Sequence, residues 1–193
     1  VGEPHSEPLR FPVQLVIRPQ LAAGDEFRDY RGYAGQVASG LVRVGDPVTV
    51  QPSGRTSTVV GIDTADGDLA SAFAPQSVTL RLADDIDISR GDLIVTSRSV
   101  PPVTQDINGT IAWLAERPLV PGAKVLLKHG TKTVQAIVKA ISGRLDLDDA
   151  RLFPAELLEL NDIGHVNLRL AAPIPAEEDP NSRSTGAVLL TDP

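Results

Sequence analysis

The chain of 193 residues contains no cysteine and no methionine, and it has only one tryptophan. Without cysteine it can form no disulfide, thiolate zinc site or cysteine nucleophile. No apolar run approaches the roughly 18 residues that indicate a membrane-spanning helix, and no secretory signal opens the chain. We therefore expect a cytoplasmic protein. Because the chain begins with Val1 and lacks methionine, we expect it to be a segment or processed form of a longer protein.

Positive charge is also scarce. Lysine and arginine together number 18 against 25 acidic residues, which gives a net charge of -7. Non-specific nucleic-acid affinity depends on Lys and Arg contacts to phosphate, so this balance disfavours a broad nucleic-acid surface but leaves a local basic patch open. A hydrophobic share of 41% is typical of a globular protein, and the length allows one large or two small domains.

A nucleotide-binding phosphate loop is nearly present but incomplete. The form G-x-x-x-x-G-K-[ST] supplies backbone amides, a lysine and a hydroxyl that binds magnesium. Gly35 and Gly40 have the required separation, but Leu41 and Val42 occupy the positions of the lysine and the hydroxyl residue. We therefore expect no cofactor in these residues and interpret the two glycines as part of a strand and a turn.

Glycine and proline, 16 of each, separate short runs of Val, Ile, Leu and Thr, a pattern typical of strands and turns. Apolar and polar residues alternate, as in half-buried strands, in segments 78–82, 124–128, 131–141 and 166–170. Within 131–141 the pattern places Val134, Ala136, Val138 and Ala140 on one face, with Thr133, Gln135, Ile137 and Lys139 on the other. The only predicted helix lies near residues 154–159. We predict an all-β protein with a closed or nearly closed barrel in each half, because closure removes exposed strand edges.

The adjacent prolines Pro101 and Pro102 predict a stiff connector, because each fixes its own φ angle and biases the preceding residue towards extended conformations. We therefore predict four parts along the chain: an N-terminal extension over 1–9, a first barrel over 10–98, a Pro-rich linker over 99–104 and a second barrel over 105–193.

Residues 28–40, with Arg31-Gly32 followed by Gly40 and a Val-Gly-Asp turn at 44–46, resemble domain two of translation-type GTPases of the elongation factor Tu class. The segments 28–35 and 85–92 give a more specific match. Their sequences are similar to segments of the GTPase subunit of bacterial sulfate adenylyltransferase. Further matched segments follow the same order: 10–14, 18–19, 113–116, 118–122, 160–164 and 181–187. The resemblance covers nearly the whole chain and implies two consecutive β-barrels of the elongation factor Tu domain 2 and domain 3 type.

The resemblance implies the non-catalytic barrel module of a large subunit. In that family GTP hydrolysis, with Mg, on the large subunit drives adenylyl transfer on a small subunit, which makes adenosine 5'-phosphosulfate and pyrophosphate from ATP and sulfate. The implied partners are a GTPase domain, the small subunit and, in some bacteria, a fused adenylylsulfate kinase. Two alternatives stay open: the barrels of a translation factor that binds aminoacyl-tRNA, which the acidity disfavours, and an unrelated double-barrel binding module.

Two short loops are candidate interaction sites. The first loop contains two arginines and two tyrosines: Arg28, Tyr30, Arg31 and Tyr33. Charged and aromatic residues together are enriched at binding hot spots. The alternative is that the arginines pair with Asp25, Glu26 or Asp29 and the tyrosines cover a barrel end. The second loop offers a guanidinium and hydroxyls to an anion or a partner through Arg183, Ser184 and Thr185, and the alternative there is a plain turn at Gly186.

We predict no catalytic or metal-binding residue. The three histidines, His5, His129 and His165, lack the spacing that places two ligands on one helical face. The acidic clusters at 84–87 and 146–149 do not fit a calcium-binding loop. Solvated loop charge is the simpler interpretation of both clusters, and Ile86 with Ile88 suggests the edge of a strand.

Adding GTP to the 193-residue chain should therefore give no binding signal in a calorimetric titration, because the lysine and the hydroxyl of a phosphate loop are absent. A micromolar response would overturn this interpretation of Leu41 and Val42.

Overall fold

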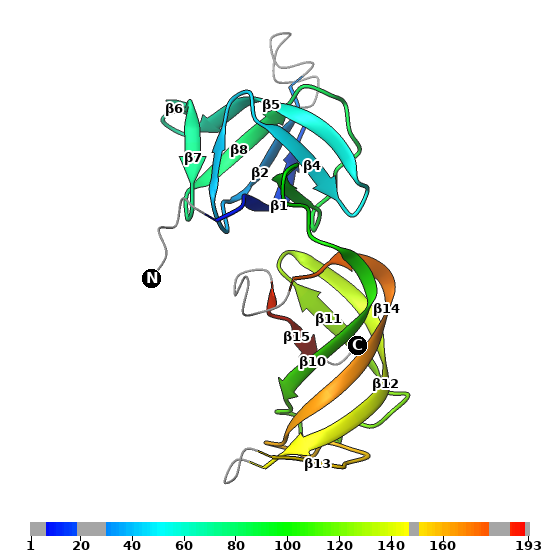
Figure 1. The fold of residues 1–193 in the computed structure, drawn as a ribbon. Helices are drawn as coiled ribbons and strands as arrows, with labels where there is room; N and C mark the ends of the chain where they lie inside the picture. The colour runs from blue at the N-terminus through cyan, green and yellow to red at the C-terminus, as the bar shows by residue number, and fades with distance from the viewer. Residues whose placement is uncertain (1–6, 19–29, 147–150, 178–185, 192–193) are drawn as a thin grey trace. The chain divides into compact units, whose positions relative to one another are not determined.

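The computed structural model describes residues 7–18, 30–146, 151–177 and 186–191, and its named elements are fifteen β-strands (Figure 1). The described residues include no helix with the length and apolarity needed to span a bilayer. The chain forms two compact units. The first comprises 1–103, 129–132 and 175–187, and the second comprises 104–128, 133–174 and 188–193. The all-β fold predicted from the sequence is confirmed, whereas the predicted division into four parts stays a prediction.

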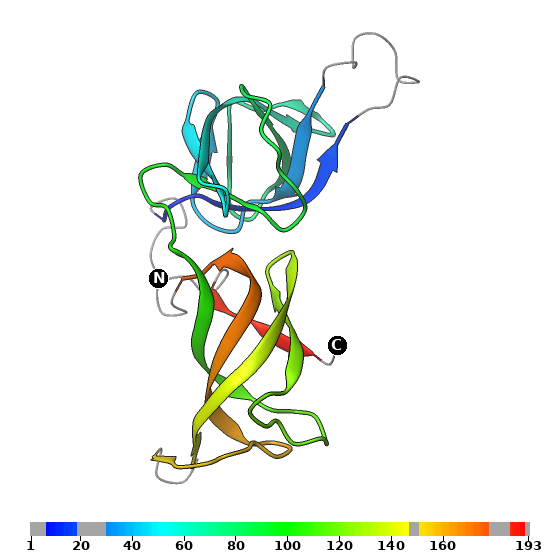
Figure 2. The same ribbon diagram turned by 90° about the vertical axis from the view of Figure 1, so that its right-hand side faces the viewer.

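The strands of the first unit are β1 (Arg10–Ile17), β2 (Gly32–Gln36), β3 (Leu41–Arg43), β4 (Pro47–Gln51), β5 (Arg55–Thr64), β6 (Gly67–Asp68), β7 (Ser71–Phe73), β8 (Ser77–Leu82) and β9 (Leu93–Thr96). Hydrogen bonding runs in the order β4-β9-β1-β2-β8-β5-β6, and β4 also pairs with β5. The pairing of β4 with β5 closes strands β4, β9, β1, β2, β8 and β5 into a ring, and β6 lies outside it as a partner of β5 (Figure 2).

The ring of the first unit encloses its hydrophobic core. Alternate residues of the strands point inward, as the two-residue period requires, and Phe11, Val13, Ile62 and Leu80 have no exposed surface. Ile86 and Ile88 are also buried, at 3% and 2% exposure, but residues 86–88 are not in a strand. The expected strand edge there is therefore wrong, because this segment contributes to the core as irregular chain.

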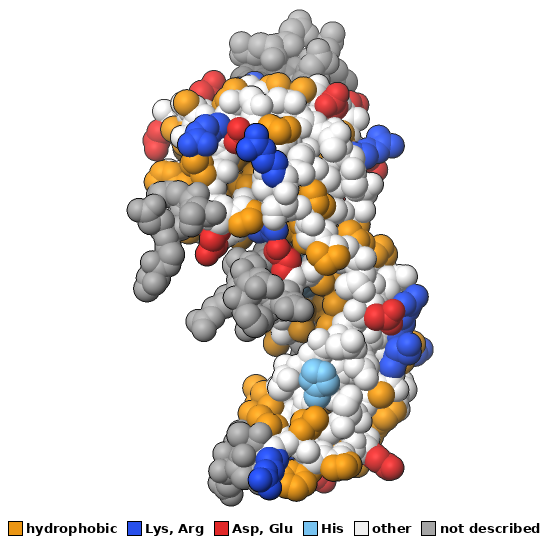
Figure 3. Space-filling view, in the orientation of Figure 1, with side chains coloured by type: hydrophobic (Ala, Val, Ile, Leu, Met, Phe, Trp, Pro, Cys, Tyr) orange, Lys and Arg blue, Asp and Glu red, His pale blue; other side chains and the backbone are white. Residues whose placement is uncertain are grey.

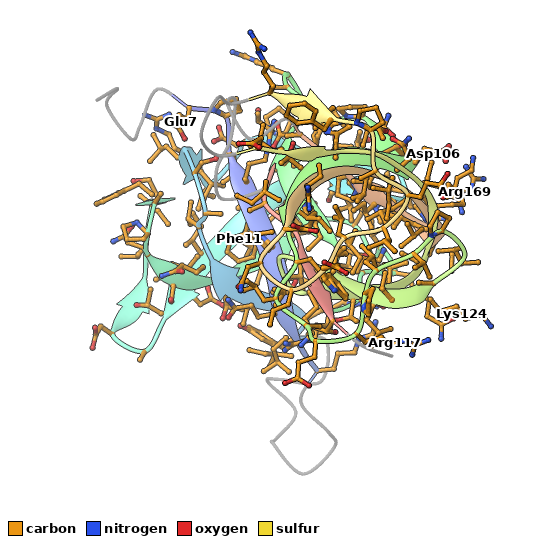
Figure 4. The ribbon with its side chains drawn as sticks, turned by 90° about the horizontal axis from the view of Figure 1, so that it is seen from below. Glu7, Phe11, Asp106, Arg117, Lys124 and Arg169 are labelled. Atoms are coloured by element: carbon orange, nitrogen blue, oxygen red, sulfur yellow. The ribbon has the colours of Figure 1, made fainter. Side chains whose placement is uncertain are left out.

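The second unit contains β10 (Val103–Ala112), β11 (Lys124–His129), β12 (Lys132–Leu145), β13 (Leu152–Phe153), β14 (Ile163–Pro175) and β15 (Leu189–Thr191). Its sheet has the order β10-β14-β12-β11-β15, and β13 pairs with β12. On the outer surface, Arg169 of β14 donates to Asp106 of β10 over 2.7 Å, and Figure 4 shows these two side chains beside each other.

The four predicted strand segments are confirmed: 78–82, 124–128 and 166–170 lie within β8, β11 and β14, and 131–141 begins one residue before β12. One detail of the predicted faces of 131–141 is wrong, because Ala140 does not share the buried face of Val134, Ala136 and Val138. The pairing of β12 with β14 shifts register between Val138 and Ala140. A bulge adds one residue to the strand and so changes which residues face inward. As a result Ile141 is buried at 8% exposure, while Ala140 is only half-buried.

The predicted helix at 154–159 is wrong. Leu158 exchanges backbone hydrogen bonds with Leu119, over 2.9 and 3.0 Å, and its side chain has no exposed surface. A long-range backbone pairing with a buried side chain therefore outweighs the local helical preference of this segment.

Arg10 is a buried cation, 3% exposed, inside the first unit. Its guanidinium donates to the backbone oxygens of Leu9 and Ser99, both over 2.9 Å, and to the two carboxylate oxygens of Glu177, over 2.8 and 2.6 Å. A buried charge is tolerated only when such partners replace its water. Arg10 therefore fixes β1 to two distant segments of the same unit.

Gly40 has a φ angle of +74° and lies against the chain just before β1. A Cβ atom at this position would lie 2.5 Å from the carbonyl oxygen of Glu7 and 2.7 Å from the amide nitrogen of Leu9. Both the left-handed backbone and the tight contact therefore require glycine.

Substitution Gly40→Ala should destabilise the first unit more than Gly54→Ala does. Gly54 has nearly the same φ angle, +72°, but a Cβ atom there would have no neighbour within 4 Å. Alanine at Gly54 should cost about 1–2 kcal/mol for the left-handed backbone alone. At Gly40 overpacking should add about 1–3 kcal/mol. Urea unfolding of the two variants measures the difference, and equal losses would contradict the predicted contact.

Candidate interaction site

Gly35 and Gly40 do not form a phosphate-binding loop. Gly35 lies in β2, and the amides that follow it are already used: Val37 donates to the backbone oxygen of Gln76 over 2.9 Å, and Ala38 donates to that of Arg10 over 2.8 Å. Phosphate binding requires free amides at this position. These paired amides therefore do not fit a nucleotide. Gly35 lies in a strand, as interpreted from the sequence, whereas Gly40 lies in a bend just before β3.

The predicted site residues have different surroundings. Arg28, Arg183, Ser184 and Thr185 lie outside the described residues. Tyr33 is 1% exposed, and its hydroxyl donates to the backbone oxygen of Ile86 over 3.1 Å. Burial raises the pKa of the Tyr33 phenol. This side chain therefore belongs to the core, and the structure leaves no surface of its ring for a partner.

Tyr30 is half-buried and belongs to a polar cluster that sequence reasoning missed. Its hydroxyl donates to a carboxylate oxygen of Asp63 over 2.8 Å, while the Nε atom of Arg81 donates to both oxygens of Asp63, over 3.0 and 2.9 Å. Asp68 lies 3.7 Å from the same guanidinium. Burial and the hydrogen bond to Asp63 raise the pKa of Tyr30 to about 12. We call Tyr30, Asp63 and Arg81 the tyrosine cluster.

Two glycines make room for the tyrosine cluster. A Cβ atom at Gly32 would lie 2.8 Å from the hydroxyl of Tyr30 and 2.5 Å from a methyl group of Thr79, and one at Gly61 would overlap the guanidinium of Arg81. The Arg31-Gly32 pair thus has a local physical reason: glycine lets the preceding tyrosine fold back onto the barrel. Gly61, two residues before Asp63, is the signal in the sequence that could have pointed to this cluster.

Arg31 forms an ion pair with Asp85, while the partners named in the alternative, Asp25, Glu26 and Asp29, lie outside the described residues. The side chain of Arg31 is 20% exposed and that of Asp85 is 86% exposed. The buried Nε atom of Arg31 has no hydrogen-bond partner among the described residues. This pair, together with the contact of Tyr33 with Ile86, joins the two sequence segments 28–35 and 85–92 at one end of the barrel.

An open pocket of about 370 Å³ adjoins the tyrosine cluster. Tyr30 and Asp63 line it, together with polar side chains of β8 such as Ser77 and Thr79. Tyr30 retains its proton at neutral pH, and Asp63 already accepts three hydrogen bonds, so neither group is placed to transfer a proton.

The described residues hold no group of three or more His, Asp or Glu side chains that could bind a metal ion. His129 is buried, and the Nδ1 atom of His165 lies 3.3 Å from the hydroxyl of Thr110. The acidic cluster at 84–87 is divided between separate contacts, since Asp84 accepts from the hydroxyl of Ser57 while Asp85 pairs with Arg31.

Solved structures define the class of fold. Sup35 complexed with GMPPNP matches with a TM-score of 0.82 at 19% identity, over 96% of this chain and 44% of that one. The translation elongation factor SelB from Methanococcus maripaludis matches with a TM-score of 0.71 at 18% identity, over 98% of this chain and 39% of that one. The family model described as GTP-eEF1A C-terminal domain-like matches residues 106–193. The chain therefore has the β-barrel fold of elongation-factor-type proteins.

The sequence relatives are more specific. The chain is 43% identical over its full length to the bifunctional enzyme CysN/CysC of Mycobacterium tuberculosis, of which it spans 31%. It is 45% identical over 99% of its length to sulfate adenylyltransferase subunit 1 of Methylorubrum extorquens, of which it spans 39%. The predicted resemblance to the large subunit of bacterial sulfate adenylyltransferase is confirmed, and the chain spans about a third of the length of these relatives.

Alkaline titration should show that the phenol of Tyr30 loses its proton at a higher pH than an ordinary tyrosine does. In a Tyr33→Phe variant the one remaining phenol should titrate near pH 12 when folded and near its ordinary pKa of about 10 in denaturant. Because the folded-state pKa is the higher one, the contribution of Tyr30 to stability is fully present below pH 10 and is lost as pH rises from about 10 to about 12. Ultraviolet difference absorbance measures the titration, and Tyr30→Phe should remove it. Titration near pH 10 in the folded protein would contradict the buried hydrogen bond.

Proposed function

We propose that this chain is the non-catalytic two-barrel module of a sulfate adenylyltransferase large subunit. It couples GTP hydrolysis in a GTPase domain to adenylyl transfer on the small subunit, which makes adenosine 5'-phosphosulfate and pyrophosphate from ATP and sulfate. The observation that carries the proposal is the identity of 43% and 45% to CysN/CysC and to subunit 1 over essentially the whole chain. Relatives named as bifunctional also suggest a fused adenylylsulfate kinase as a neighbour in some proteins.

A coupling role agrees with the chemistry of the described residues. The amides of Val37, Ala38 and Ser39 already pair with protein carbonyls, so we propose that GTP and Mg are bound by other residues of the full-length protein. The tyrosine cluster and the Arg31–Asp85 pair provide a rigid polar surface instead. Because the barrels do not themselves react, we propose that they act by changing their contacts with neighbouring domains as the nucleotide state changes.

We propose that Arg31 and Tyr30 contact the GTPase domain or the small subunit. Arg31 is mostly buried but has a partner that is almost fully exposed, so a second protein can approach Asp85 and cover the pair. A partner that covers this charge pair would exclude water from it and so strengthen the attraction between the two charges, as at the centre of many interfaces. Arg28 and the loop of Arg183, Ser184 and Thr185 stay candidate contacts predicted from the sequence alone.

The translation-factor alternative predicts a surface that binds tRNA. On the face shown in Figure 3, lysine and arginine side chains are interspersed with acidic ones, and the whole chain carries a net charge of -7. Tight binding to phosphate would require a concentration of positive charge. A salt-sensitive gel shift with aminoacyl-tRNA would favour this alternative, and we expect none.

The chain should bind the cognate small subunit in a calorimetric titration. Replacing Arg31 by Gln should weaken this association by about tenfold, as expected when an interface arginine loses its charge. Arg55→Gln is the matched control, because Arg55 is an exposed arginine of the same unit outside the proposed interface, and it should leave the affinity unchanged. Absence of binding, even with the GTPase domain supplied separately, would count against the proposed function. Equal effects of the two variants would refute only the assignment of Arg31.

A further inference from the structure

The strands of the second sheet carry almost all of their charge as lysine and arginine. Strands β10 to β15 contain six lysine and arginine residues but only one acidic residue, Asp106. The other acidic residues described in this unit lie outside its strands. The whole chain, in contrast, has a net charge of -7. Positive charge is therefore concentrated on one sheet of a protein that is acidic as a whole.

Four of these cations share the outer face of the sheet. Because successive side chains of a strand alternate between its two faces, the neighbours of buried core residues point outward. The exposed cations in such positions lie on the adjacent strands β11, β12 and β14 and are Lys124, Lys128, Lys139 and Arg169. Figure 4 shows Lys124 and Arg169 pointing outward on the same side of the unit. We call these four residues the basic face.

An apolar side chain lies among these cations. Ile137 of β12 is 46% exposed and pairs with Arg169 of β14. On its other side, backbone hydrogen bonds between Val138 and residues 122–123, over 2.7 and 3.0 Å, place Lys124 next to Ile137. Ile137 therefore has a cationic neighbour on each of the two adjoining strands.

The basic face is only partly neutralised within the protein. Arg169 donates to Asp106 over 2.7 Å, and the Nζ atom of Lys139 lies 3.9 Å from the same carboxylate. Lys124 and Lys128 form no ion pair with any described residue. One carboxylate cannot balance four cations, so the face keeps an excess of positive charge. Such an excess attracts a negatively charged partner.

The apolar side chains on this face favour a protein as the partner. Leu189 of β15, 58% exposed, pairs with Lys128, as Ile137 pairs with Arg169. Apolar residues surrounded by charged ones are typical of protein interfaces, whereas a phosphate backbone offers them no apolar contact. Strands β11, β12 and β14 also contain no Phe, Tyr or Trp on which a base could stack.

We propose that the basic face binds a carboxylate-rich surface of the small subunit, whose apolar side chains pack on Ile137 and Leu189. The identity of this partner rests on the proposed function. A separate subunit must find its site by diffusion, and opposite charge steers such an encounter and raises its rate. A domain of the same polypeptide is already held at a high local concentration. The charge of the face therefore favours the separate subunit over the linked GTPase domain.

Charge reversal on the basic face of the full-length large subunit tests the proposal. The double variant Lys124→Glu/Lys128→Glu should associate with the immobilised cognate small subunit at least about tenfold more slowly at low salt, as measured by surface plasmon resonance. The difference should shrink towards about 1 M salt, because salt screens exposed charges. The matched control is Arg43→Glu/Arg55→Glu, which makes the same change in net charge at two exposed arginines of the first unit. It should alter the association rate by no more than about twofold.

The outcomes separate this inference from the proposed function. If the unsubstituted large subunit does not bind the small subunit, both are refuted. If it binds but the two double variants associate at equal rates, only the assignment of the basic face is refuted.

A third variant tests the apolar contact. Ile137→Ser should raise the dissociation rate by about three- to tenfold and leave the salt dependence unchanged, because it removes packing and no charge. An unchanged dissociation rate would contradict packing on Ile137. A salt-sensitive gel shift with tRNA that Lys124→Glu/Lys128→Glu abolishes, with small-subunit binding intact, would assign the face to nucleic acid and overturn the proposal.

Discussion

The close contact between residues 35–40 and strand β1 is the constraint on which the first barrel depends. A side chain at Gly35 would overlap the carbonyl oxygen of Pro12, and one at Gly40 would meet the backbone of residues 7–9. Since β1 lies between β2 and β9 in the ring, its position decides whether both neighbours can pair. Arg10 then extends this anchoring to Ser99 and Glu177 through a buried network of hydrogen bonds.

This constraint also explains why the sequence imitates a phosphate loop. Two backbones can approach closely at a glycine because it has no Cβ atom, and a phosphate can approach a backbone at a glycine for the same reason. In this chain the space is filled by β1, and the amides of Val37 and Ala38 pair with protein carbonyls. The Arg31-Gly32 pair has a similar local cause, because Gly32 lets Tyr30 reach Asp63. The motif residues thus build a rigid barrel end that can present a fixed surface to a partner.

The sequence predicted the barrels well because alternating apolar residues report directly on strands with one buried face. It failed where long-range contacts decide the conformation. Leu158 is extended because it pairs with Leu119, and the bulge in β12 moves the core position from Ala140 to Ile141. Tyr33 was grouped with surface residues because its neighbours are charged, although its ring faces the core. Asp63 and Arg81 were missed because they are distant in sequence and meet only when β5 and β8 pair.

The most direct test of coupling is the dependence of adenylyl transfer on GTP in a reconstituted enzyme. The small subunit would be combined with the full-length large subunit or with its GTPase domain lacking residues 1–193, and adenosine 5'-phosphosulfate would be measured with and without GTP. We predict that GTP stimulates product formation only when the barrels are present, although the isolated GTPase domain still hydrolyses GTP. Equal stimulation without the barrels would contradict the account.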